Sequence, residues 1–276
     1  MGKGPGFYYE LGKKTKDLIN KDYTYDQKFT VNTETAAGLN LSTTGTKRGE
    51  GFAADVSTSF KRKNILAEVK IDTRSNILTT VTLDEFVDGA KSTFSFTIPD
   101  QKSGKVEAQY AHDHVGITGS IGLTPNPLVE VSGVIGAEGL VLGGEVGYDT
   151  GSGRLTKYNA GVGFTKPDFS TALHLLDKGD VLKGSYVHLV DPTSRNQIAA
   201  EIAHRFSKSE STFTLGGLYE LDPSTTMKGR MNNHGKLAAL VQHEWRPKSL
   251  LTVSGEVDTK ALDKSAKIGL TLALKP

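Results

Sequence analysis

Three short motifs in this sequence contain residue types that carry out chemistry in other proteins. His112-Asp113-His114 offers metal ligands, the glycines at 143–153 resemble a phosphate-binding loop, and Asn40-Leu41-Ser42 fits a glycosylation acceptor. Adjacent strand residues point to opposite faces and no third ligand is apparent, so we expect a turn at 112–114. The glycines lack Walker spacing and are expected in a hairpin turn, and no secretory signal accompanies the acceptor. The sequence therefore predicts no metal site and no cofactor.

Composition narrows the function classes further. The 276 residues include no cysteine, and 33 Lys and Arg against 31 Asp and Glu leave a net charge of +2. Without cysteine there are no disulfides, thiolate nucleophiles or thiolate metal sites. A near-neutral balance lacks the strong basic excess of a dedicated nucleic-acid binder. No serine or histidine stands out as an activated nucleophile, so we expect neither an enzyme nor a protein with nucleic-acid specificity.

The elements that would position any site are strands. From about residue 26 to the end, segments of about eight to eleven residues alternate apolar with polar positions. In the last segment one face carries Ala266, Ile268, Leu270, Leu272 and Leu274. Glycine-containing turn clusters at 47–51, 100–104 and 149–153 separate the segments. We count about eighteen or nineteen such strands in a single domain.

The two strand faces differ in a way that indicates the environment. One face is uniformly Leu, Val, Ile and Ala, whereas the other is charged or Gly, Ser and Thr, which is too polar to fill a core. An apolar exterior suits lipid, where every backbone amide must be paired and strands must therefore close on themselves. No run approaches the roughly 18 apolar residues of a spanning helix. Residues 26–276 are thus expected to form an all-β transmembrane barrel, the alternative being a soluble β-rich binding protein.

The first 25 residues break this alternation and predict a helix. With 100° per residue, Phe7, Tyr8, Leu11, Leu18 and Ile19 fall on one side, together with Thr15. The opposite arc carries Glu10, Lys13, Lys14, Lys16 and Asp17. We expect residues 1–25 to form an amphipathic helix and hinge inside the barrel, with the apolar stripe on the wall and the charges facing water.

Three segments resemble one family, the voltage-dependent anion channels of the mitochondrial outer membrane, and most closely their plant members. These are Lys3-Gly4-Pro5-Gly6 through Tyr23, the stretch from Tyr219 to Val241 that fits the eukaryotic porin signature, and His243 to Pro276. The resemblance covers the whole chain and implies nineteen strands around a lumen helix. It also implies a voltage-gated, weakly anion-preferring channel for ATP, ADP, phosphate and other small metabolites. Expected partners are membrane lipid, small anionic metabolites and nucleotides, a homo-oligomer and cytosolic docking proteins.

Two departures from the family pattern bear on mechanism. Family members often have a glycine-rich hinge after the helix, whereas this chain has Asp22-Tyr23-Thr24-Tyr25-Asp26. Some animal members carry a lipid-facing glutamate in the fourth strand, and Glu68 lies near that place. Because Ile65, Ala67, Val69 and Ile71 form the apolar face, Glu68 is expected to point inward.

The alternation and the resemblance together name candidate site residues. By alternation the inward-facing cations of the wall join the helix lysines in an anion path consisting of Lys13, Lys16, Lys21, Lys91, Arg205, Lys228, Arg230 and Lys236. Gly89-Ala90-Lys91 also resembles a loop motif proposed to meet nucleotides. The last strand resembles the sorting signal of mitochondrial outer-membrane barrels at Lys267, Gly269, Leu272 and Leu274. The alternative within the same superfamily is a preprotein-import pore, which the basic helix disfavours.

Overall fold

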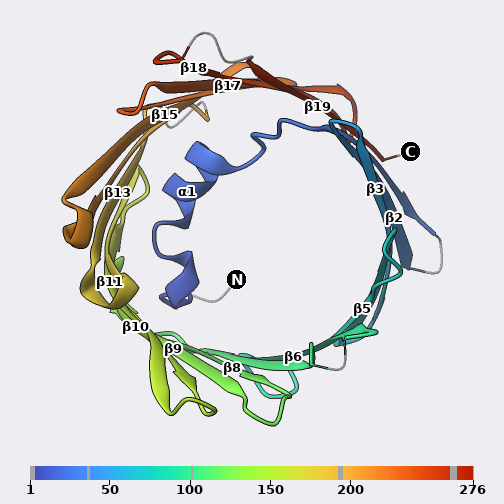
Figure 1. Cartoon of the computed structure of the whole chain (residues 1–276), viewed down its shortest axis with the longest axis vertical. Coiled ribbons are helices and arrows are strands. Elements are labelled where there is room, and N and C mark those ends of the chain that lie inside the picture. Colours follow the sequence, from blue (N-terminus) through green and yellow to red (C-terminus); the bar gives the residue numbers. More distant parts are fainter. Residues whose placement is uncertain (1–3, 36–37, 101, 192–194, 262–265, 276) are drawn as a thin grey trace.

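The chain folds into a ring of strands with the N-terminal segment inside it (Figure 1). The computed structural model describes residues 4–35, 38–100, 102–191, 195–261 and 266–275. Within these residues, one 19-stranded sheet contains every strand, and each strand pairs with a neighbour on both sides. The predicted closed barrel of nineteen strands is therefore confirmed. The sequence pattern alone left eighteen and nineteen open, and the family resemblance favoured nineteen.

The strands follow one another around the ring in chain order. The first ten are β1 Gln27–Glu34, β2 Leu39–Arg48, β3 Gly51–Arg62, β4 Ile65–Asp72, β5 Ile77–Asp84, β6 Ala90–Ile98, β7 Lys105–Ala111, β8 Val115–Gly122, β9 Leu128–Ala137 and β10 Leu140–Asp149. The remaining nine are β11 Arg154–Thr165, β12 Phe169–Leu176, β13 Val181–Leu189, β14 Gln197–Arg205, β15 Glu210–Asp222, β16 Thr225–Asn232, β17 Lys236–Arg246, β18 Ser249–Asp258 and β19 Lys267–Leu274. The short connections make neighbouring strands antiparallel.

The ring closes where the first and last strands meet. β1 pairs with β19 in parallel, from Gln27 opposite Leu270 to Val31 opposite Leu274. An odd number of strands in an up-and-down order forces this one parallel pair. Parallel pairing is slightly less stable per residue than antiparallel pairing. The β1–β19 seam is therefore the strand pair whose backbone hydrogen bonds contribute least to the closure of the barrel.

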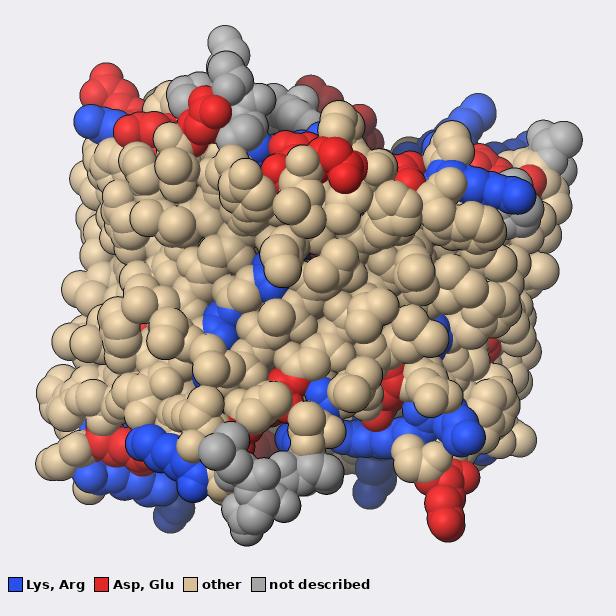
Figure 2. Space-filling model, turned by 90° about the horizontal axis from the view of Figure 1, so that it is seen from above, with Lys and Arg blue, Asp and Glu red and all other residues tan. Residues whose placement is uncertain are grey.

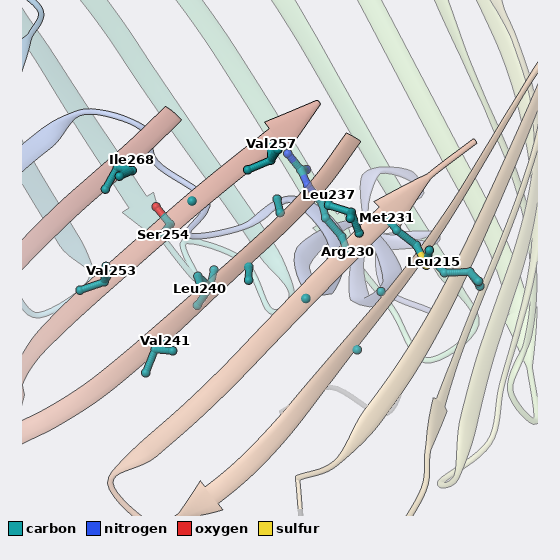
Figure 3. A pocket seen from close by; sticks show the side chains of 16 residues that line it. Leu215, Arg230, Met231, Leu237, Leu240, Val241, Val253, Ser254, Val257 and Ile268 are labelled. Atoms are coloured by element: carbon teal, nitrogen blue, oxygen red, sulfur yellow. The ribbon is translucent and has the colours of Figure 1, made fainter. Parts of the chain in front are cut away.

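The outer face is apolar and the charges gather at its two rims. Large hydrophobic side chains such as Ile135, Ile198 and Ile268 are more than half exposed on it. A band that is mainly uncharged separates the charged rims in the view of Figure 2. On β15 to β18, Gly217, Gly229, Ala239 and Gly255 lie opposite one another in register. Without large side chains there, the outer face has a hollow of about 1020 Å³ edged by Met231, Leu237 and Val253 (Figure 3).

The N-terminal segment is less continuous than the predicted helix. A 3-10 turn at Tyr8–Glu10 is followed by the α-helix α1 at Lys13–Asn20. Gly12 separates them with φ of +68°, a left-handed conformation that glycine adopts without strain. The predicted N-terminal helix is therefore present, but it begins only at Lys13, and the apolar residues from Phe7 to Leu11 precede it. Within the described residues, no helix is long and apolar enough to cross a bilayer.

The motif at 112–114 takes the predicted form, and the glycines at 143–153 take it only in part. His112–His114 form the turn between β7 and β8, with His112 N–H donating to Val115 O at 2.8 Å. Gly151 and Gly153 lie in the turn after β10, as expected. Gly143 and Gly147 instead lie within β10, so their hairpin assignment was wrong. A Cβ on Gly143 would lie 3.1 Å from Tyr8 Cδ2 of the N-terminal segment, whereas one on Gly147 would meet Thr156 and Lys157 of β11.

Candidate functional site

The register of the barrel assigns each strand residue to the lumen or the outer face. Arg230 donates to Ile19 O on the lumen helix, so its side of β16 faces the lumen. Directly opposite residues share a face, which carries this assignment from strand to strand. Across β17 and β18 it reaches Glu256, and across β19, β1, β2 and β3 it reaches Glu68 on β4. Glu68 thus points inward, as the alternation predicted.

The wall under the N-terminal segment is lined with glycines. A Cβ on Gly136 would lie 2.8 Å from Pro5 Cβ, and one on Gly163 would lie 2.6 Å from Leu11 Cδ2. A Cβ on Gly216 would lie 3.1 Å from side-chain atoms of both Leu18 and Ile19. These distances are shorter than ordinary van der Waals contact, so the segment lies where side chains are missing. Glycines on the polar faces of the strands were the sequence signal for this contact surface, and the sequence reasoning missed it.

The helix buries one face and exposes the other. Leu18 and Ile19 pack with Val187 and Ala199 of the wall, and Thr15 is also buried. Lys13, Lys14, Lys16 and Lys21 are exposed on the lumen side. Among the described residues, none of these lysines forms an ion pair with a carboxylate, whereas many wall cations do. The helix therefore presents unpaired positive charge to the water in the lumen.

Arg230 connects the end of the helix to the wall. Its Nη1 donates to Ile19 O at 3.1 Å and to Asn20 Oδ1 at 2.9 Å. Its Nη2 donates to Tyr25 Oη at 3.0 Å and to Glu256 Oε2 at 3.1 Å. Its guanidinium also lies 4.6 Å from the ring centroid of Tyr23. Charge-assisted bonds of this kind are stronger than neutral ones, so Arg230 fixes the helix end.

Lys228 and the tyrosines complete this attachment. Lys228 is 8% exposed and its Nζ lies 3.1 Å from Asp22 Oδ2. Burial raises the pKa of Tyr23 to about 12, with the Arg230 guanidinium acting in the opposite direction. Burial also raises the pKa of Tyr25, and its hydroxyl bond to Glu256 adds to the shift. Both phenols therefore stay neutral at physiological pH and serve as donors or as ring surfaces.

The other predicted wall cations also lie on the lumen face but in different surroundings. Lys91 is half exposed on β6, with Nζ 3.7 Å from Asp84. Arg205 lies at the end of β14, where its guanidinium is 3.1 Å from Asp177 and 3.5 Å from Asp180. Lys236 is exposed at the start of β17 and borders a small lumen pocket with Asn20 and Glu256. These three cations do not converge with the helix lysines on one site.

A second lumen pocket lies between the helix and the rim of β12 and β13. Its volume is about 430 Å³, and its cations are Lys14, Lys21, Lys166 and Lys228. Asp17, Asp22 and Asp168 line it too, so the charge is mixed. Among the described residues, no group of three or more His, Asp or Glu side chains is arranged to hold a metal.

The four residues that resemble a sorting signal lie on the two faces of β19. Lys267 and Gly269 face the lumen, whereas Leu272 and Leu274 lie on the outer face. Lys267 Nζ is 3.7 Å from Glu256 Oε1, and Gly269 is buried beneath residues 24 and 25. Half of the motif therefore takes part in lumen contacts that sequence reasoning did not foresee.

Comparisons with known proteins agree with this geometry. Residues 4–269 match the sequence profile of the eukaryotic porins. The chain is 54% identical to the mitochondrial outer membrane protein porin of 36 kDa from Solanum tuberosum and 53% identical to an outer plastidial membrane protein porin from Pisum sativum. It is 51% identical to mitochondrial outer membrane protein porin 1 from Arabidopsis thaliana. In all three cases the match covers 100% of both chains.

One solved structure, a mutant of the porin of Rh. blastica, covers 83% of this chain and 89% of its own at 7% identity and a TM-score of 0.47. That likeness adds nothing to the assignment, which depends on the full-length sequence matches and on the profile. The chain belongs to the eukaryotic porin family.

Proposed function

We propose that this porin is a voltage-gated, weakly anion-preferring channel for ATP, ADP, phosphate and other small metabolites in the mitochondrial outer membrane. The location follows the names of the potato and Arabidopsis relatives, and the pea relative makes a plastid envelope the second candidate. The observation that carries the ion preference is the row of exposed, unpaired helix lysines inside the lumen. In this proposal, residues 1–25 are the selective unit and residues 26–276 are the membrane-spanning unit.

The size of the barrel supports passage of hydrated metabolites. Nineteen strands spaced about 4.8 Å apart and tilted about 40° give a backbone diameter of roughly 38 Å. Side chains and the helix narrow this bore, which still admits a nucleotide but excludes a folded protein. The screening length is about 8 Å at physiological salt, so a charge acts only on ions that pass close to it. Because the helix protrudes into the lumen, its lysines meet more of the passing ions than wall lysines do.

Voltage gating of the proposed channel requires the movement of only a few charges. Moving one charge through 100 mV is worth about 2.3 kcal/mol, so three charges at 50 mV supply roughly 3.5 kcal/mol. That energy shifts an open–closed equilibrium a few-hundredfold. The positive segment inside the lumen provides charge on this scale.

Two alternatives remain distinguishable. A preprotein-import pore needs an acidic path for basic presequences, and the exposed helix lysines disfavour it. A soluble β-rich binding protein would not expose an apolar band around its circumference. A homo-oligomer and cytosolic docking proteins are further proposed partners, which the outer face and the rims would contact.

The test is single-channel recording of the purified protein in a planar bilayer under a KCl gradient. We expect large conductance steps and partial closure as the magnitude of the voltage increases in either polarity. The reversal potential should be shifted toward the equilibrium potential of chloride. Addition of ATP should lower the conductance without blocking it. Absence of conductance in a protein that needs no detergent would overturn the proposal, and a reversal potential on the potassium side would overturn its ion preference.

A further inference from the structure

Residues 22–26, which lie between the helix and β1, each contact the barrel. Asp22 pairs with Lys228 on β16, and the ring of Tyr23 faces Arg230. Thr24 and Thr271 of β19 share a hydroxyl hydrogen bond of 3.0 Å, and the Ser254 hydroxyl donates to Thr24 O. The Tyr25 hydroxyl donates to Glu256 on β18 at 2.6 Å. A flexible hinge would not have a separate partner for each residue.

Asp26 extends the same attachment to the other side of the ring. Its carbonyl accepts from Leu270 N–H on β19 at 3.1 Å, and its carboxylate lies 3.6 Å from Arg48 Nε at the end of β2. Residues 22–26 thus join β16, β18 and β19 to β2. The strands they join lie on both sides of the parallel β1–β19 seam.

Gly269 makes this path possible. It lies on the lumen face of β19, directly beneath the backbone of Thr24 and Tyr25. A Cβ at this position would overlap the Thr24 carbonyl and would lie 2.8 Å from Tyr25 Cα. The obstacle is backbone rather than a movable side chain, so any larger residue must displace the segment. Gly133 in β9 offers a contrast, since a Cβ there would meet nothing within 4 Å.

We propose that Asp22–Asp26 form a clamp across the β1–β19 seam rather than a hinge, and that Gly269 is the residue that admits it. The clamp supports the one parallel pair of the barrel and fixes the C-terminal end of the helix. Gly269 then has a role in the folded barrel that is separate from any role in sorting. This inference goes beyond the proposed ion preference and does not depend on it.

The experiment compares Gly269→Ala with Gly133→Ala during refolding from denaturant into detergent, where no mitochondrial machinery is present. Refolded yield and the thermal midpoint of the β signal in circular dichroism are measured. We expect Gly269→Ala to lower the midpoint by at least about 3 °C and to reduce the yield, because overpacking against backbone is costly. Gly133→Ala should behave as the wild type. Equal midpoints and yields for the two variants would overturn the proposal.

Two further variants keep the test decisive if Gly269→Ala fails to refold. Tyr25→Phe removes only the hydroxyl that joins Glu256 and Arg230, and should lower the midpoint by a smaller amount. The pair Thr24→Cys and Thr271→Cys introduces the only cysteines of the chain. On oxidation it should form a disulfide, raise the midpoint and leave voltage-dependent closure unchanged. A disulfide that forms and abolishes closure would show that this segment moves, and would overturn the clamp.

Discussion

The lumen holds two groups of cations that the sequence pattern could not tell apart. Lys13, Lys16 and Lys21 are exposed on the helix, and none pairs with a carboxylate among the described residues. Lys228 is 8% exposed, and the Arg230 side chain is 22% exposed. Arg230 binds the end of the same helix, and Lys228 binds Asp22 two residues beyond it. One group thus leaves its charge open to the lumen water, and the other bonds to the segment that carries the first group.

The difference shows that charge and strand face are not enough to assign a role in permeation. A cation whose donors are already bonded to protein has little electrostatic effect on a passing anion, because its neighbours offset its field. Substituting it changes the structure around it as well. We therefore propose that Lys228 and Arg230 position the helix and that the helix lysines set the ion preference, and the following measurements can separate the two roles.

The largest expected effect is that of Arg230→Ala on stability. The substitution leaves Glu256, whose side chain is 12% exposed, with the Tyr25 hydroxyl and with Lys267, a cation 3.7 Å away, in place of the closer Arg230. Loss of one partner of such a pair costs about 3 kcal/mol in the free energy of unfolding. Denaturant unfolding in detergent measures it, with Lys91→Ala as the matched control, since that half-exposed pair should contribute less than about 1 kcal/mol. Equal losses for the two variants would show that Arg230 does not hold the helix.

A smaller effect is expected for the ion pair between Lys228 and Asp22. A double-mutant cycle with Lys228→Met and Asp22→Asn should give a coupling energy of about 1 kcal/mol in the free energy of unfolding. The same cycle should give little coupling in the reversal potential, because in this account the pair only holds the N-terminal segment in position. Strong coupling in the reversal potential without coupling in stability would move Lys228 into the permeation path and remove the distinction between the two groups.

Strand alternation predicted the barrel and the faces of its residues because a period of two is a local property. It placed Lys91, Arg205, Lys228, Arg230 and Lys236 on the face that proved to be the lumen. Their pairing could not be predicted in the same way. The bond from Arg230 to Asn20 joins residues 210 positions apart, and it exists only because the chain closes into a ring. The strand count was also beyond local pattern, since one strand more or less leaves the alternation unchanged.

The helix was predicted where it lies, but its continuity was not. The wheel placed Thr15, Leu18 and Ile19 on the buried side, as the structure has them. It could not show that Gly12 takes a left-handed conformation. That turn depends on how the preceding residues pack against the glycines of the wall. The clamp was missed for a related reason. Asp22 to Asp26 departed from a glycine-rich hinge, but only the fold shows where their side chains bind.

The measurement that tests the central claim most directly is the reversal potential of Lys13→Glu/Lys16→Glu in a KCl gradient. The pair of substitutions moves the charge of the helix by about four units at neutral pH. The control is Lys91→Glu/Lys105→Glu, which makes the same charge change on β6 and β7, whereas α1 packs on β13 to β16. These two lysines are paired with Asp84 and Glu107. We predict that the helix variant becomes neutral or potassium-preferring, whereas the wall variant keeps most of its chloride preference. Equal shifts for the two variants would contradict the claim that the helix lysines set the preference.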